Sequence, residues 1–329
     1  MKTIRFLLAG AALLASQAAF ADLKIVTTTA DLASITRAIG GNKASVSSLI
    51  TGARDPHRLE AKPSFMSRIS GASLFIAVGL GLEVGYERAI LSGSANRRVA
   101  IGAAGNLHVG DYCYILEKPA GSVSRAMGDI HPEGNPHVWL DPYNGRLIAK
   151  AIEERMSSLD PGNAKAYQQN LESFLDRLDS AMFGKAAVGR HGAQRLWEWS
   201  NAGTLAGKSD VGGWAAQMAP LSGKAIITYH RSWSYLARRF GLKVVEELEP
   251  KPGLEPTPGH LAEVVKVGSQ QGAKLILQEP YFSRRSSDFV AGRIGVSVVV
   301  APLSVGHDPA AKDYIGLFDT IIAKLKAAS

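Results

Sequence analysis

The stretch covering residues 128–142 reads GDIHPEGNPHVWLDP, and the rest of the chain is organised around it. It combines two Gly, three Pro and one Asn, which predicts a series of tight turns. Pro136 fixes its own φ and restricts Asn135 to extended backbone, so His137 is presented on a stiff support. Asp141 and the proline after it predict the N-cap and first residue of a helix. An imidazole held between a rigid turn and a helix start suits a metal ligand, although a surface histidine in a turn has the same local pattern.

Short apolar strands alternate with helical segments on both sides of this stretch. Before it, strands are predicted at 23–28, 45–50 and 74–78, with helices at 30–39 and 61–69. After it, strands are predicted at 224–229, 242–245, 274–278 and 297–300, with helices at 232–240, 260–270 and 314–326. Such alternation is typical of α/β proteins in which helices flank mainly parallel sheets. Ligands of these sheets bind beyond the carboxyl ends of the strands.

The longest helical pattern lies mid-chain, at about residues 163–183, with apolar residues at three- and four-residue steps. A helix of about 20 residues spans about 30 Å, the diameter of a small domain. We therefore predict two lobes, at residues 22–160 and 187–329, joined by a backbone helix within residues 161–186. No element is predicted at 187–210, where the sequence is rich in Gly and Ser and has little periodicity.

The first 21 residues predict a signal peptide. Lys2 and Arg5 supply the positive region, residues 6–14 the apolar region, and Ala19-Phe20-Ala21 the cleavage site. Cleavage after Ala21 should leave 308 of the 329 residues, a length that usually forms two domains. No Cys follows the site, so we expect a periplasmic protein without a lipid anchor.

Charge and composition give little evidence for any partner. The formal charge of +8 is scattered along the chain without a dense basic run, so no nucleic-acid partner is predicted. Cys113 is the only cysteine, which rules out an intrachain disulfide. With 46% hydrophobic residues, stability should come from burial of a core, and we expect a monomer.

Three histidines stand where strand-end loops should converge: His57, His137 and His230. Two of them share the pattern Asx-Pro-His. Three imidazoles and one oxygen ligand form a tetrahedral site that favours Zn²⁺, whereas Mn²⁺ prefers more carboxylate oxygens. The separations of 80 and 93 residues exclude a local, finger-type site.

Over residues 23–328 the chain resembles the solute-binding proteins of zinc and manganese ABC importers, the cluster A-I metal-binding family. The matching segments are Asp55-Pro56-His57, Asn135 to Pro142, Thr228-Tyr229-His230, Glu249-Pro250 and Gln278-Glu279-Pro280. In this family, histidines at the first two positions bind metal. Zinc-type members carry a third histidine where many manganese members carry glutamate. The resemblance therefore implies a periplasmic, high-affinity zinc-binding protein that delivers Zn²⁺ to the membrane subunits of an ABC permease.

Two departures from the family pattern bear on the fourth ligand and on metal capture. The family often supplies a fourth ligand from an Asp in a late Asp-Pro-Leu segment, which here reads Ala301-Pro302-Leu303. Glu279 or a water must then fill the fourth position. The His-rich loop of many zinc members is also missing, since residues 108–134 contain only His108 and His131.

Some further residues could take part in the metal site, and two other functions are compatible with three histidines. His131 could orient a ligand or bind the metal transiently. We interpret Asp129, Glu133, Glu247 and Glu249 as solvated turn residues, although each could hydrogen-bond to a ligand imidazole. The alternatives are a manganese or iron carrier of the same fold, or a zinc hydrolase, because three histidines and a water also form a catalytic site. The chain has no His-Glu-x-x-His motif, and Glu279 is the only evident general base, so we predict a carrier and not an enzyme.

Overall fold

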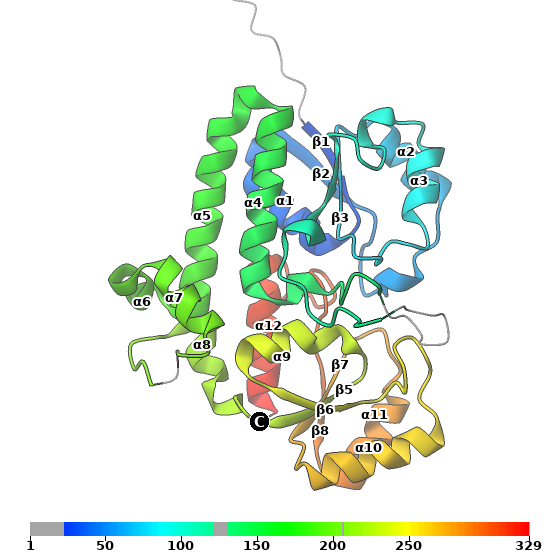
Figure 1. The fold of residues 1–329 in the computed structure, drawn as a ribbon, viewed down its shortest axis with the longest axis vertical. Helices are drawn as coiled ribbons and strands as arrows, with labels where there is room; N and C mark the ends of the chain where they lie inside the picture. Colours follow the sequence, from blue (N-terminus) through cyan, green and yellow to red (C-terminus); the bar gives the residue numbers. More distant parts are fainter. Residues whose placement is uncertain (1–22, 122–130, 206, 329) are drawn as a thin grey trace, which may run out of the picture.

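The structure is a computed structural model that describes residues 23–121, 131–205 and 207–328. The predicted signal peptide and its cleavage site lie outside these residues. Two lobes, each built on a parallel sheet, lie one above the other in Figure 1, with long helices along one side. The predicted fold class is confirmed. Within the described ranges, no helix combines the length and the apolar character needed to cross a membrane.

The first sheet has the strand order β2-β1-β3-β4, with every pair parallel. Its strands are β1 (Leu23–Thr27), β2 (Ala44–Ser48), β3 (Leu74–Ala77) and β4 (Asn106–His108). The helices of this lobe are α1 (Ala30–Gly40), α2 (Pro63–Ser70) and α3 (Glu87–Gly93). Strand β3 is fully buried because helices and loops cover both faces of the sheet, as expected for a parallel sheet.

The second sheet repeats this arrangement, with the order β6-β5-β7-β8 and parallel pairing throughout. Its strands are β5 (Ala225–Thr228), β6 (Lys243–Glu247), β7 (Leu275–Gln278) and β8 (Ser297–Val300). The surrounding helices are α9 (Ser234–Phe240), α10 (Pro258–Gln270), α11 (Arg284–Ile294) and α12 (Tyr314–Ala327). The carboxyl ends of the two sheets face each other across the boundary between the lobes (Figure 1).

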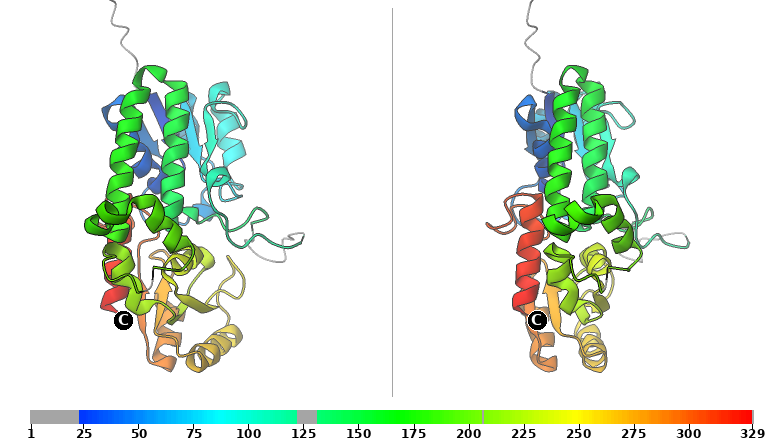
Figure 2. Two further views of the ribbon diagram at one scale, coloured as in Figure 1. Left: turned by 60° about the vertical axis from the view of Figure 1, so that its left-hand side comes forward. Right: turned by 90° about the vertical axis from the view of Figure 1, so that its left-hand side faces the viewer.

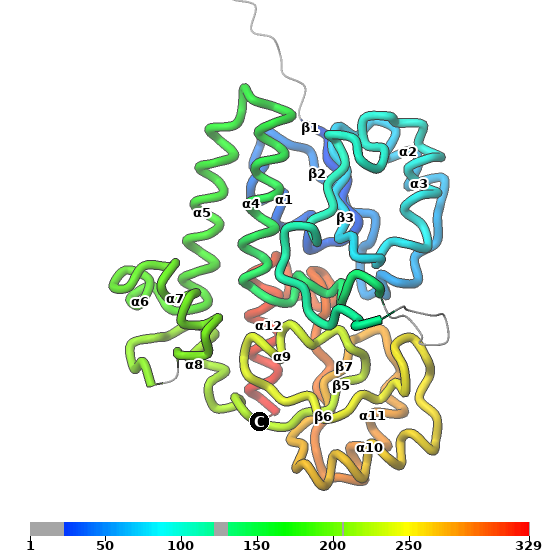
Figure 3. The backbone as a smooth tube through the Cα atoms, viewed as in Figure 1, coloured from blue at the N-terminus to red at the C-terminus, as the bar shows by residue number. Residues whose placement is uncertain are grey.

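The two longest of the described helices are antiparallel to each other: α4 (Pro142–Leu159) and α5 (Ala164–Phe183). Figure 2 shows them side by side along the first lobe, and Figure 3 shows the chain passing from the end of α5 into the second lobe. Asp141 caps α4 by accepting a hydrogen bond from the Tyr143 amide, and Pro142 takes the first helical position, as predicted. The lobe boundaries given above stay predictions, although α5 lies within residues 161–186.

The segment without a predicted element contains two short helices, α6 (Lys185–His191) and α7 (Ala193–Asn201), followed by α8 (Gly213–Met218). Trp197 of α7 packs edge-on against Phe183, with ring centroids 4.7 Å apart. Its indole N–H donates to Asp179 of α5 over 2.7 Å. This tertiary contact anchors helices whose Gly-rich sequence gives little local signal.

The junction between the lobes is packed around Tyr314, the first residue of α12. Its hydroxyl donates to the backbone carbonyl of Trp139 over 2.6 Å. A Cβ at Gly145 of α4 would come within 2.4 Å of that hydroxyl, so the helix can approach only because residue 145 has no side chain. Nearby, the buried guanidinium of Arg239 makes a bidentate ion pair with Asp141, at 2.7 and 2.8 Å. These contacts fasten α9 and α12 of the second lobe to the start of α4.

Candidate metal site

The three predicted histidines come from three different loops that meet between the lobes. His57 lies in a single 3₁₀ turn, Pro56–Arg58, on the loop after β2. His137 lies directly before the 3₁₀ turn Val138–Leu140, whose three residues are buried and anchor it. His230 follows the end of β5, where the chain leaves the second sheet. Each is therefore on a loop beyond a strand end or beside the start of α4, as the parallel sheets predict.

The structure brings these histidines together. One potential ligand atom from each lies within 4.8 Å of the other two. The ring centroids are separated by 5.1 Å for His57 and His137, 5.5 Å for His57 and His230, and 5.6 Å for His137 and His230. Nitrogens bound to zinc at about 2.0–2.1 Å lie at most about 4 Å apart, so only small inward shifts separate this arrangement from a coordination shell.

Each Nδ1 atom of the three histidines has a hydrogen-bond partner. Asp55 Oδ1 lies 2.9 Å from His57 Nδ1, and Glu249 Oε2 lies 2.6 Å from His230 Nδ1. A carboxylate can only accept, so Nδ1 carries the hydrogen and Nε2 carries the lone pair. The Nε2 atoms are thereby available for a metal, the arrangement usual for ligating histidines.

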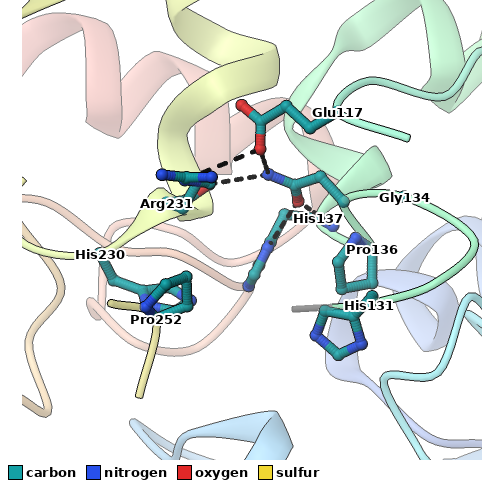
Figure 4. Close-up of a pocket in the computed structure, with 9 residues that line it drawn as sticks. Glu117, His131, Gly134, Pro136, His137, His230, Arg231 and Pro252 are labelled. Atoms are coloured by element: carbon teal, nitrogen blue, oxygen red, sulfur yellow. Dashed lines mark hydrogen bonds and ion pairs between the residues drawn. The ribbon is translucent and has the colours of Figure 1, made fainter. Parts of the chain in front are cut away.

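His137 reaches the same tautomer through an amide. Asn135 Oδ1 accepts from the amide N–H of His137 at 3.0 Å and lies 2.9 Å from its Nδ1. The orientation of the Asn135 amide is fixed because its NH₂ group donates to Glu117 Oε2 at 3.0 Å and to the Arg231 carbonyl at 2.9 Å. Figure 4 shows this chain of contacts from Glu117 and Arg231 to His137.

Burial and neighbouring charges shift the pKa values of His137 and His230 in opposite directions. The pKa of His137 is lowered well below its usual value by burial, and then by the positive charge that His57 and His230 would carry. Burial also opposes protonation of His230, but its hydrogen bond to Glu249 and the charge of that carboxylate outweigh the effect, so its pKa is raised. The hydrogen bond and charge of His57 outweigh burial at Asp55 and lower the pKa of its carboxyl. Each imidazole thus has its Nδ1 held by an acceptor, a carboxylate at His57 and His230 and an amide at His137, an arrangement that suits a divalent cation at Nε2.

Glu279, the predicted alternative to a water, lies at the end of β7 and is fully buried. Neither carboxylate oxygen has a hydrogen-bond partner among the described residues. Burial raises the pKa of Glu279 to about 7, against the opposing influence of His230. Its oxygens do not belong to the set of mutually close ligand atoms, which comprises His57, His137 and His230 alone among the residues described. Ligation by Glu279 stays a prediction.

A narrow pocket of about 40 Å³ opens onto the histidines between the lobes. His131, His137 and His230 line it together with Pro252, and Figure 4 shows these side chains around the opening. His131 also contacts His57, with ring centroids 5.3 Å apart. Burial lowers the pKa of His131 to about 4, with a further contribution from the charges of His57 and His230.

The residues that orient the imidazoles were largely missed from sequence. The interpretation of Glu249 as a solvated turn residue is wrong, because it is 5% exposed and holds His230. Asp55 and Asn135 were recognised only as parts of a motif. Their spacing offered a signal, since an Asx side chain two residues before a histidine can bond to the backbone and side chain of that histidine. Asp129 lies outside the described residues.

Comparison with known proteins places this chain in a family. The model of the family described as zinc-uptake complex component A, periplasmic (ZnuA), matches residues 25–182 and 212–328. The manganese ABC transporter substrate-binding lipoprotein PsaA of Streptococcus mitis is 32% identical over 164 residues, 48% of each chain. The zinc-binding lipoprotein AdcA of Streptococcus pneumoniae is 24% identical over 313 residues, 92% of this chain and 55% of AdcA. ZnuA of Bacillus subtilis is 25% identical over 278 residues, 84% of this chain and 77% of that protein.

The alignments with PsaA span about half the length of that relative, 48%. Solved structures extend the likeness of fold to nearly the whole chain. A crystal structure of ZnuA superposes with a TM-score of 0.68 at 23% identity, covering 94% of this chain and 99% of that chain. The Ni²⁺ complex of the substrate-binding protein FpvC from P. aeruginosa gives a TM-score of 0.67 at 21% identity, covering 94% and 98%. On the family match over most of its length, this chain belongs to the ZnuA family of periplasmic zinc-uptake components.

Proposed function

We propose that the protein binds Zn²⁺ outside the cytoplasm and delivers it to the membrane subunits of an ABC permease. The observation that carries this proposal is the meeting of His57, His137 and His230, each with its Nδ1 held by another side chain. Family membership and the zinc-binding relatives AdcA and ZnuA support the same function.

The three histidines are the proposed ligands, and Glu279 or a water is the proposed fourth. The buried, unpartnered carboxylate of Glu279 supports a role beside the cation, whether it ligates directly or only balances charge. A divalent cation enclosed by neutral imidazoles gains from nearby negative charge, which Asp55 and Glu249 also supply behind the ring nitrogens.

The donor set favours zinc over manganese. Imidazole nitrogens suit zinc and other late transition metals, while Mn²⁺ prefers carboxylate and water oxygens. The alternative is a carrier of the same fold that binds manganese or iron. The similarity to the manganese protein PsaA supports the manganese form of this alternative.

We infer that the protein acts as a carrier, because its ligands come from both lobes. A cation held between two lobes can be released when loops of either lobe move, which suits transfer to a partner. The predicted export, the absence of a lipid anchor and a monomeric state belong to this proposal.

The test begins with protein purified without added metal. Native mass spectrometry should find one zinc per chain, and competition with a chromophoric chelator should give a tight zinc constant and a much weaker manganese constant. His230→Ala should lose zinc, while His260→Ala, a matched histidine outside the site, should retain it. Manganese bound more tightly than zinc would favour the manganese carrier. Zinc-dependent hydrolysis of ester or peptide substrates, lost in His230→Ala, would favour the hydrolase.

A further inference from the structure

A fourth histidine, His131, shares a structural feature with two of the proposed ligands, His57 and His137. The Nε2 atoms of His57, His131 and His137 are all buried and have no hydrogen-bond partner among the described residues. Leaving a buried polar atom unpaired is destabilising, so such atoms in a folded protein call for a physical reason. A metal ion gives that reason at His57 and His137. We propose that His131 Nε2 is a further metal ligand, which completes a shell of four imidazoles and makes the site selective for zinc over manganese.

The His131 imidazole packs against the backbone at Gly81. His131 makes a backbone hydrogen bond with Gly81, and a Cβ at that glycine would lie 3.0 Å from His131 Nδ1. Gly81 also has a φ of +80°, which residues with a side chain rarely adopt. Gly81 thus lies on the Nδ1 side of the ring, and Nε2 is the buried nitrogen without a partner, as at His57 and His137.

The direction of the side chain agrees with this role. His131 lines the same pocket as His137 and His230, and its ring contacts that of His57. Figure 4 shows His131 below Pro136, on the side of the pocket opposite His230 and Pro252. Its nitrogen is not within the mutually close set, so metal binding should draw the ring inward past His57.

The inference rests on the proposed function and replaces the water at the fourth position. Three imidazoles and a water already favour zinc, but they leave one position to an oxygen ligand that manganese and iron also accept. A fourth nitrogen shifts the donor set toward metals late in the Irving–Williams order. Glu279 then acts as a buried counter-charge near His230 and does not ligate the metal.

The experiment follows the ring nitrogens directly. Protein labelled with ¹⁵N-histidine is titrated with zinc, and long-range ¹H–¹⁵N spectra report which Nε2 atoms change to the metal-bound shift. Four Nε2 resonances should change in the parent protein. Three should change in His131→Gln, which identifies the fourth, and four in the control variant His260→Gln.

Selectivity gives a second readout. The ratio of the manganese to the zinc dissociation constant should fall in His131→Gln by on the order of tenfold or more, the scale on which one coordination-sphere group acts. It should not fall in His260→Gln. The inference is overturned if only three Nε2 resonances change in the parent, or if His131→Gln keeps the selectivity of the parent. Either result leaves the three-histidine carrier intact, whereas a parent that binds no zinc overturns the proposed function itself.

Discussion

Asn135 and Arg231 are joined across the two lobes, because the Asn135 side chain donates to the Arg231 carbonyl over 2.9 Å. Asn135 also positions His137, and Arg231 directly follows His230. One amide thus connects a proposed ligand of the first lobe to the peptide beside a proposed ligand of the second. The hydroxyl of Tyr235 reinforces the connection by donating to the Asn135 carbonyl at 2.7 Å.

Asn135→Asp should weaken zinc binding by about 10- to 100-fold, the usual effect of losing a group that orients a ligand. The aspartate keeps the acceptor for His137 but places a second oxygen against Glu117 and the Arg231 carbonyl, both of which only accept. Simple electrostatics predicts the opposite sign, since a new negative charge near a cation should tighten binding. Chelator competition measures the difference. Asn42→Asp is the control, because it makes the same substitution at an exposed residue away from the histidines. Tighter zinc binding by Asn135→Asp would contradict the orienting role.

Replacing any one of His57, His137 and His230 with Ala should remove most of the thermal stabilisation by zinc. Zinc that binds only the folded state adds about 4 kcal/mol of stability at a thousandfold excess over Kd. Melting curves with and without zinc measure the shift, and His260→Ala should behave as the parent does. A His230→Ala protein that zinc stabilises as strongly as the parent would refute the third ligand and the zinc assignment together.

Glu279→Gln should keep most of the zinc stabilisation, because the substitution preserves shape and removes only a buried charge. The apo melting temperature serves as the control for folding. If zinc no longer stabilises this variant, Glu279 is a ligand and the four-imidazole shell is wrong.

Zinc binding should weaken as the pH falls below neutral. Zinc needs neutral imidazoles, and the raised pKa of His230 means that a proton competes for this histidine at a higher pH than for an ordinary one. Zinc affinities measured by competition at pH 8, 7, 6 and 5 should show the loss beginning with the first step below neutral. An affinity that stays constant from pH 8 to pH 5 would exclude histidine ligation.

Asp31 should make the apo protein less stable as the pH rises. This carboxyl of α1 accepts from the Val305 amide at 2.9 Å and from the Ser304 hydroxyl, and burial raises its pKa to about 6. The folded state therefore holds a proton that the unfolded state releases at lower pH, so stability falls between about pH 4 and 6. Compared with the parent, Asp31→Asn should lose less stability between pH 4 and 7 in denaturant titrations. Equal losses in the two proteins would show that Asp31 ionises normally.

The parallel sheets, the long helix and the three histidines could be predicted because each depends on local pattern. Apolar strands, helical periodicity and strand-end loops all appear within short windows of sequence. The burial of Glu249 could not be predicted, because it depends on contacts formed only in the fold. Its amide donates to the Tyr229 carbonyl, and its carboxylate accepts from the Gly253 amide and holds His230. Helices α6 and α7 were missed for a similar reason, since Trp197 gains its partners only when α5 lies beside it. The position of His131 depends on Gly81, which is 50 residues away in sequence.

Gly145 sets the distance between the two lobes at their helical contact. Tyr314 rests where a side chain at residue 145 would lie, so one absent methyl group sets how closely α12 of the second lobe approaches α4 of the first. Metal–nitrogen bonds tolerate errors of only about 0.2 Å, and the proposed ligands are divided between the same two lobes. We therefore expect the geometry of the proposed cation site to depend partly on a helix contact that touches none of its proposed ligands. A family member with alanine at this position would need a compensating smaller residue at position 314 to hold its lobes in the same register.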